Sequence, residues 1–315
     1  MLVSSAGSKV PLVVQLVEAM QIVSPTSLLV VGDTEELCPA RHFAQGFLKM
    51  PTLESMSLEK LVALLQQNSI VAVLPTRDGE LLFWAKHKEL FEESGIAVMV
   101  SSEKSVQLCE DKLAFGQLEP GKGWRMIPTS TSPNAQEADQ FVVKERFGAG
   151  SIGLGLCLTR EDALLHAKNL TNAVFQPFIN LPEISIDAYV TESGEVHGMV
   201  LRHRNRVVHG ESEVSSTFKD FVAESAVHNL LERLELRGPV VVQAFLGESE
   251  LLVIEVNPRF GGASTVSRAV GLNLAEWSVR ELLEPIEPLP LFIRTQHEAQ
   301  LIRYKKDLIR HGPGF

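Results

Sequence analysis

The fold is decided by the stretch Val253-Ile254-Glu255-Val256-Asn257-Pro258-Arg259-Phe260-Gly261-Gly262. It ends an apolar run from Leu251 that predicts a buried strand, in which side chains point alternately to the two faces of the sheet. Glu255 and Asn257 are therefore predicted to share one face, and their oxygens are hard ligands of the kind that Mg²⁺ takes together with phosphate oxygens. Arg259 adds a permanent cation beside them. The stretch indicates a site for a magnesium nucleotide, although an ordinary strand end and turn would also contain Asn, Pro and Gly.

Length and composition place the chain among ordinary globular proteins. Its 315 residues are enough for two or three hydrophobic cores. The formal net charge of −10 argues against nucleic acid as the main partner, because binding to phosphate backbones needs a basic surface. The cysteines Cys38, Cys109 and Cys157 are too widely spaced to indicate a zinc site or a disulfide framework, which fits a reducing compartment. The sequence has no apolar run of membrane-spanning length and no signal-peptide pattern, so we expect a cytoplasmic protein without a membrane partner.

Residues 1 to about 105 alternate short apolar strands with helices. The pattern predicts strands at 1–3, 28–33, 70–74 and 96–100 and helices at 11–20, 58–67 and 82–94. Strands that alternate with helices usually form a parallel sheet covered on both faces. The segment lacks the G-x-G-x-x-G fingerprint, so a dehydrogenase that uses this sheet is the least favoured function considered.

The rest of the chain has the pattern of a mixed α/β region. A stretch rich in Pro, Ser, Thr and Gly predicts a loop over 121–139. The strands predicted after it are 141–144, 173–179, 184–190, 196–203, 240–245, 251–256 and 299–304, and the helices are 161–169, 223–234 and 274–283. Short polar connections predict that the third and fourth of these strands form one hairpin and the fifth and sixth another.

A second motif consists of Lys144 at a strand end and the glycine-rich run 148–153 that follows it. An ammonium group offsets phosphate charge, and glycines let backbone N–H groups close around phosphate oxygens. Because the lysine precedes the glycines, this is not a P-loop, and a glycine-rich hairpin beside a surface lysine is the alternative. Gln243, on the first strand of the second hairpin, is predicted to face Glu255 and to add a third oxygen donor to the same sheet surface.

The order of these motifs resembles the ATP-grasp ligases. The resemblance is closest to stand-alone proteins similar to the large subunit of carbamoyl-phosphate synthase and to the pyrrolysine-biosynthesis ligase. It runs over nearly the whole chain and rests on the segments 2–7, 71–76, 89–95, 111–112, 142–153, 238–243 and 255–259. It implies an α/β architecture of the α+β ATP-grasp type. A pre-ATP-grasp domain with a parallel sheet (1–105) would precede a two-subdomain ATP-grasp fold, with a small subdomain that carries the glycine-rich loop (106–175) and a central and C-terminal subdomain (176–315).

The resemblance also implies a role for each matching residue. The residues implied to contact ATP are Lys112, Lys144, Gly148, Gly150, Ser151, Gln176, Phe178 and Ile179, with Glu183 on the ribose hydroxyls. One or two Mg²⁺ ions, or Mn²⁺ in their place, would be bound by Gln243, Glu255 and Asn257. The residues implied to act in catalysis are Arg259, Lys144 and Arg204, with Arg202 and His209 as further basic groups near the acceptor carboxylate. For the basic residues Arg202, His203, Arg204 and Arg206, a solvated strand is the alternative.

The activity that the resemblance implies is an ATP-dependent carboxylate–amine ligase. The γ-phosphoryl group of ATP would activate a small-molecule carboxylate as an acyl phosphate, and a small-molecule amine would then displace phosphate to give an amide. This chemistry needs no side-chain nucleophile, which agrees with the lack of a convincing Ser/His/Asp or Cys/His set in the sequence. A non-catalytic or degenerate ATP-binding scaffold is the alternative, and a homodimer is compatible with either.

Overall fold

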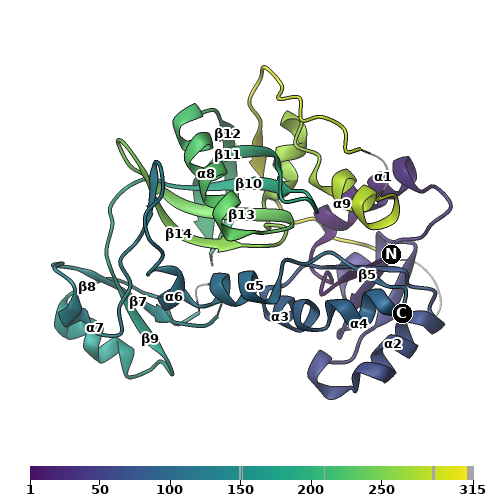
Figure 1. The fold of residues 1–315 in the computed structure, drawn as a ribbon, viewed down its shortest axis with the longest axis horizontal. Coiled ribbons are helices and arrows are strands. Elements are labelled where there is room, and N and C mark those ends of the chain that lie inside the picture. The colour runs from purple at the N-terminus through teal and green to yellow at the C-terminus, as the bar shows by residue number, and fades with distance from the viewer. Residues whose placement is uncertain (149, 151, 209, 286–287, 311–315) are drawn as a thin grey trace.

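The computed structural model describes residues 1–148, 150, 152–208, 210–285 and 288–310. Its strands form three sheets, with helices packed against them (Figure 1). Within these ranges, no helix combines the length and the apolar character that a membrane span requires. The architecture is mixed α/β with a parallel sheet at the N-terminal end, as predicted.

The N-terminal sheet has parallel strands in the order β3-β2-β1-β4-β5. Its strands are β1 (Leu2–Ser4), β2 (Val30–Asp33), β3 (Gly46–Lys49), β4 (Ala72–Pro75) and β5 (Ala97–Val98), and the helices are α1 (Val10–Val23), α2 (Leu58–Gln67), α3 (Asp78–Lys86), α4 (Lys88–Glu93) and α5 (Glu103–Glu110). The single helix expected at 82–94 is wrong, because the backbone leaves helical geometry at His87 (φ −113°, ψ 12°), where α3 ends and α4 begins. β2 and β4 flank the central strand β1, so the carboxyl ends of β1 and β4 form the switch point of the sheet.

The central sheet has the order β15-β12-β11-β10-β13-β14-β6. Its strands are β6 (Trp124–Met126), β10 (Glu183–Val190), β11 (Val196–Val208), β12 (Glu211–Phe218), β13 (Gly238–Leu246), β14 (Leu251–Asn257) and β15 (Gln300–Ile302). Both predicted hairpins are confirmed as the antiparallel pairs β10–β11 and β13–β14. The loop expected over 121–139 is wrong at β6, which runs parallel to β14 and buries Trp124 and Met126 in the core shared with helix α8 (Phe221–Leu234).

A β-bulge in β14 decides which face of the central sheet Glu255 occupies. Val253 pairs with Ala244 and Glu255 pairs with Gln243, so Ile254 is the extra residue on the bulged strand. Val253 and Val256 both pack in the core beneath α8, which strict alternation would not allow. The bulge therefore turns Glu255, together with Asn257, to the face opposite α8.

The third sheet, in the order β8-β7-β9, carries the glycine-rich connection. Its strands are β7 (Phe141–Glu145), β8 (Gly155–Leu158) and β9 (Ala173–Pro177); α6 (Lys112–Phe115) precedes them, and α7 (Arg160–Ala167) packs against them through Ala163. The division of the chain at residues 105 and 175 stays a proposal. β6 comes from the middle part but pairs in the central sheet, and β9 spans the second boundary.

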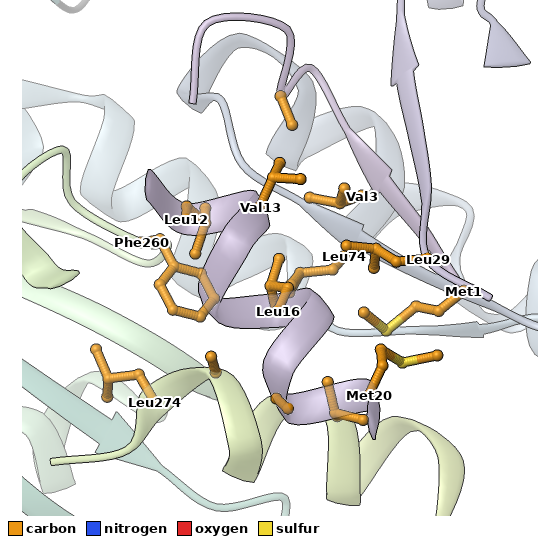
Figure 2. Packing of buried hydrophobic residues seen from close by; sticks show 14 of the residues in the cluster. Met1, Val3, Leu12, Val13, Leu16, Met20, Leu29, Leu74, Phe260 and Leu274 are labelled. Carbon is orange, nitrogen blue, oxygen red and sulfur yellow. The ribbon is translucent and has the colours of Figure 1, made fainter. Parts of the chain in front are cut away.

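Helix α1 joins the N-terminal sheet to the rest of the molecule. Its buried residues Leu12, Leu16 and Met20 share one core with Phe260 and with Leu274 of helix α9 (Leu274–Leu283) (Figure 2). An apolar interface of this kind resists relative motion of the parts that it joins. The switch point of the N-terminal sheet is therefore held close to the strand end that carries Arg259.

Candidate active site

The face of the central sheet opposite α8 is lined by polar side chains. Alternate residues of β10, β11 and β13 pack beneath α8, which leaves the intervening residues on the opposite face. The polar residues among them are Glu183, Ser185, Asp187, Arg202, Arg204 and Gln243, joined by Glu255 and Asn257 of β14. Strand pairing sets Glu255 opposite Gln243, which confirms the predicted pair, and sets Gln243 opposite Ser185.

Glu255 is the centre of the predicted metal-binding set. Its Oε1 atom accepts hydrogen bonds from Nε2 of Gln243 and from Nδ2 of Asn257, each at 3.0 Å. All three side chains belong to half-buried residues. Turning each amide about its terminal bond would exchange its NH₂ group for its carbonyl oxygen and present three oxygen ligands to one cation.

The chemistry of this set fits Mg²⁺ that arrives with phosphate groups. Within the described part of the chain, no three His, Cys, Asp or Glu side chains are grouped so that they could hold a metal ion. The set contains a single carboxylate, and Mg²⁺ is usually bound through one or two carboxylates together with substrate phosphates and water. Gln243, Glu255 and Asn257 could therefore hold Mg²⁺, or Mn²⁺, as part of a nucleotide complex.

Lys144 extends the site from the small sheet. It lies on β7, near the start of the glycine-rich connection, and is half-buried. The pKa of its ammonium is lowered to about 8, mainly by burial and also by Lys112, while Glu255 and Glu183 act in the opposite direction. These effects place Lys144 within electrostatic reach of Glu255, so two sheets contribute to the site. Within the described ranges, Lys144 has no side-chain hydrogen bond or ion pair that would occupy its ammonium.

The glycine-rich connection between β7 and β8 is held at its start by charged contacts. Lys112 Nζ donates to the carbonyl oxygen of Gly148 at 2.6 Å. Asp111, directly before Lys112, accepts two hydrogen bonds from the guanidinium of Arg146, at 2.6 and 2.5 Å. Gly148 and Gly150 have φ angles of 139° and 73°, which glycine adopts without steric cost. Ser151, also predicted in this loop, lies outside the described residues.

The segment predicted to meet adenine leads from β9 toward β10. The side-chain amide of Gln176 is buried and donates to Oγ1 of Thr129 at 2.8 Å. The backbone N–H of Phe178 donates to the carbonyl oxygen of Gln140 at 2.9 Å, so this donor is already engaged within the protein. Ile179 is half-buried, and its backbone makes no hydrogen bond to any residue in the described ranges. Its N–H and C=O are therefore available to a ligand.

Glu183 and Arg204 form an ion pair on the polar face of the central sheet. Nε of Arg204 lies 3.0 Å from Oε1 of Glu183. Arg204 also donates to Oγ of Ser185 at 3.3 Å and to the carbonyl oxygen of Gly210 at 3.0 Å. The pKa of Glu183 is raised above all by burial, against the lowering effect of Arg204. Arg204 is thus positioned by three partners beside the predicted metal-binding set.

Arg202 is a structural residue. It is 2% exposed, and its Nε and Nη2 donate to the two carboxylate oxygens of Asp187 at 2.7 and 3.0 Å. The alternative of a solvated strand is therefore wrong at Arg202. Its role near an acceptor carboxylate stays a prediction, which the near-complete burial of this guanidinium does not favour. Ser264 and Ser267 donate to the same carboxylate at 2.7 and 2.5 Å. His209 lies outside the described residues.

The network around Asp187 was missed by the sequence reasoning, although one signal was visible. Asp187 stands between Ile186 and the apolar residues 188–190, and an acid in a buried strand requires a partner. Ser264 links this network to the active site, because its Oγ also accepts a hydrogen bond from the backbone N–H of Gly261 at 2.9 Å. The turn that follows Arg259 is therefore fixed from the sheet beneath it.

Arg259 is held by the N-terminal part of the chain. Its Nε and Nη2 donate to the two carboxylate oxygens of Asp78 at 2.6 and 2.5 Å, and its Nη1 donates to the carbonyl oxygen of Phe260 at 2.9 Å. Asp78 is the first residue of α3, just beyond the carboxyl end of β4. The guanidinium is thus oriented by a bidentate ion pair, and its remaining N–H donors could meet an oxyanion.

The lowered pKa of Lys144 predicts that affinity for ATP depends on pH. An ammonium binds phosphate better than a neutral amine, so the affinity for Mg·ATP should fall as the pH rises through about 8, by up to about tenfold per pH unit. Lys144→Arg keeps its charge and is expected to abolish the decline, whereas Lys144→Met should bind weakly throughout. Calorimetric titration measures the effect, with the exposed Lys168→Arg as control. Constant wild-type affinity from about pH 7 to 9 would contradict the assignment.

Two family models match the chain. The model described as "PylC-like, N-terminal domain" matches residues 1–99, and the model described as "ATP-grasp in the biosynthetic pathway with Ter operon" matches residues 169–303. The second range includes Gln243, Glu255, Asn257 and Arg259.

The chain is also similar to curated proteins that are much longer. The carbamoyl phosphate synthase large chain of Sulfolobus acidocaldarius is 22% identical over 255 residues, which cover 73% of this chain and 24% of the relative. The corresponding protein of Thermoplasma acidophilum is 24% identical over 254 residues, which cover 71% of this chain and 24% of the relative. The chain therefore spans about a quarter of the length of these relatives.

Solved structures share the fold. The biotin carboxylase domain dimer of Hydrogenobacter thermophilus 2-oxoglutarate carboxylase, in complex with MgADP, ADP and bicarbonate, superposes with a TM-score of 0.77 at 15% identity, over 95% of this chain and 73% of that chain. N5-carboxyaminoimidazole ribonucleotide synthetase from Thermus thermophilus has a TM-score of 0.72 at 18% identity, over 95% of this chain and 82% of that chain. Together with the matched ranges, these likenesses confirm the predicted fold class.

Proposed function

We propose that this chain, which belongs to the ATP-grasp superfamily, is an ATP-dependent carboxylate–amine ligase that forms an amide with release of ADP and phosphate. The observation that carries the proposal is the set of Gln243, Glu255 and Asn257 on the central sheet, in which both amides converge on one carboxylate oxygen, with the cation of Lys144 in electrostatic reach. A carboxylate set for a divalent cation and a cation for phosphate are the two groups that a Mg·ATP complex needs. Arg259 lies two residues beyond the end of β14 and supports the assignment of phosphoryl transfer.

In the proposed first step, an oxygen of the substrate carboxylate attacks the γ-phosphorus of ATP. The bond between this phosphorus and the bridging oxygen breaks, and ADP leaves. Lys144 would offset phosphate charge, and Arg259, which Asp78 already orients, would offset the charge of the group in transfer. In the second step, an amine attacks the acyl carbon, phosphate leaves with the electrons of the C–O bond, and the nitrogen gives up a proton to leave an amide.

The remaining residues bind and orient. When bound, Mg²⁺ or Mn²⁺ supplies charge neutralisation on the β- and γ-phosphate oxygens. Gln243, Glu255 and Asn257 would hold this ion, with Glu255 as the charged ligand. The further ATP contacts that we propose are Lys112, Gly148, Gly150, Gln176, Phe178, Ile179 and Glu183. Arg204 would lie beside the acyl-phosphate site, oriented by its pair with Glu183.

The proposal is tested by screening pools of carboxylates and amines for release of ADP from Mg·ATP. ADP and phosphate should appear when a suitable acid and amine are both present, and mass spectrometry should find the mass of their amide. Pools in which each acid is replaced by its carboxamide are the control and should give no ADP. Tight binding of ATP without carboxylate-dependent ADP release from any pool would contradict the ligase and favour a non-catalytic ATP-binding scaffold.

A further inference from the structure

Three cations meet where the N-terminal sheet approaches Arg259. Lys9 lies in the connection between β1 and α1, and Arg77 lies in the connection between β4 and α3. The side chain of Lys9 reaches across the switch point, where its Nζ donates to the carbonyl oxygen of Thr76. Arg259 lies in the same group, since its charge and that of Arg77 both act on the Lys9 ammonium.

The two acids that act on the Lys9 ammonium, Glu80 and Asp78, are already engaged. Glu80 is 1% exposed and accepts four hydrogen bonds, two of them from the backbone N–H groups of Thr76 and Arg77. Asp78 is occupied by the bidentate pair with Arg259. In the part of the chain that the structure describes, no hydrogen bond or ion pair reaches the guanidinium of Arg77, which is exposed. Lys9, Arg77 and Arg259 therefore carry more positive charge than Glu80 and Asp78 balance.

The backbone around the cluster is also arranged for an anion. Helix α1 begins here at Val10, and helix N-termini favour negative charge, whereas the N-terminus of α3 already has the carboxylate of Glu80. Ser5, just beyond the end of β1, has a left-handed φ of 52°, which is strained for a residue other than glycine. Oγ1 of Thr76 donates to the carbonyl oxygen of Ser4 at 2.6 Å, with the carbonyl oxygen of Ser5 as a second acceptor at 3.2 Å, and so helps to hold this turn. Ligands of parallel sheets bind beyond the carboxyl ends of the strands at such a switch point.

The pKa of Lys9 agrees with an excess of positive charge around its ammonium. Its pKa is lowered to about 8, mainly by burial and then by Arg259. Arg77 lowers this pKa as well, and Glu80 and Asp78 raise it without restoring the usual value. An anion bound between Lys9 and Arg77 would favour the charged form of Lys9 and so raise its pKa.

We propose that the acid substrate carries a second anionic group besides its reacting carboxylate, and that Lys9 and Arg77 bind this group at the switch point of the N-terminal sheet. The inference rests on the proposed ligase function and narrows its substrate class. The substrate is then a dianionic acid, either a dicarboxylate or a phosphorylated carboxylate. The reacting carboxylate lies toward Arg259, and the second group lies toward the N-terminal sheet.

Turnover tests the proposal with acids offered in matched pairs, such as glutarate with valerate and a phosphorylated acid with its hydroxy acid. The dianionic member of the productive pair should have a kcat/KM about 10- to 100-fold higher, as expected for a charge-assisted contact. Lys9→Met and Arg77→Gln should each remove most of this preference. Lys49→Met is the control, because Lys49 is an exposed lysine of the same domain that pairs with Glu36, and this variant should keep the preference.

The outcomes separate the two proposals. ADP release that is equal within each pair, or unchanged in Lys9→Met and Arg77→Gln, overturns the second-anion site and leaves the ligase standing. No ADP release with any acid contradicts the ligase. In that case anion binding is decided without turnover, by competitive acetylation of the Lys9 amine in the presence of inorganic phosphate, glutarate or chloride. Phosphate or glutarate should protect Lys9 in the wild type but not in Arg77→Gln, and no protection by either anion overturns the site.

Discussion

Glu255→Gln is expected to lower kcat for carboxylate-dependent ADP release by about 10³-fold or more. Glu255 supplies the single carboxylate of the proposed metal set, and its Oε1 is the atom on which both neighbouring amides converge. Glutamine keeps the size of the side chain but removes the negative charge that attracts a divalent cation. Without that charge, the set would hold a divalent cation weakly, and the charge stabilisation that the cation would supply to the transition state would be lost.

Initial rates of ADP release and calorimetric titration of ATP measure this effect. In Glu255→Gln, added Mg²⁺ should no longer strengthen ATP binding as it does in the wild type. Glu250→Gln is the matched control on the same hairpin, because Glu250 pairs with Arg125 at the surface, and its rate should stay within about twofold of the wild type. If Glu255→Gln turns over at the wild-type rate, the assignment of Glu255 as a metal ligand is wrong.

The chemistry of the site was predictable where the residues that act together lie close in sequence. Glu255 and Asn257 are two positions apart on one strand, and Gln243 faces them across a short hairpin. Strict alternation, however, would have placed Val253 on the same face as Glu255. The bulge at Ile254 removes this conflict, and nothing in the local sequence marks it as a bulge. The prediction that Glu255, Asn257 and Gln243 share one face is therefore correct, but it depends on a bulge that the sequence pattern does not show.

The contacts that hold the site in place join residues far apart in sequence. Arg259 and Asp78 are 181 positions apart, and Asp187 and Ser264 are 77 positions apart. The residue types indicate that Arg259 needs an anionic partner and that Asp187 needs hydrogen-bond donors. They do not indicate which of the many acids and donors in the chain are these partners. Short strands such as β6 escape prediction for a related reason. Three residues are too few to show a period, and the burial of Trp124 depends on α8, a helix about a hundred positions later.

The largest effect on stability is expected for Arg202→Met. Asp187 is fully buried, and the guanidinium of Arg202 supplies two of the four hydrogen bonds that its carboxylate accepts at 3.0 Å or less. Methionine is similar in length and carries no charge, so the variant leaves a buried carboxylate with only the hydroxyl donors of Ser264 and Ser267. Breaking a buried ion pair from one side costs about 3 to 5 kcal/mol of unfolding free energy.

Urea unfolding followed by tryptophan fluorescence and circular dichroism measures this loss. Arg206→Met is the matched control, because Arg206 lies on the same strand with its side chain 61% exposed and pairs with Glu213 at the surface. It should cost no more than about 1 kcal/mol. The double variant Asp187→Asn with Arg202→Met should regain part of the stability, because it removes the unpaired charge. Unfolding of Arg202→Met at the wild-type urea concentration would contradict the network.

If Arg202→Met folds, its kcat should fall more than its ATP affinity, because Asp187 holds Ser264 and Ser264 holds the turn after Arg259.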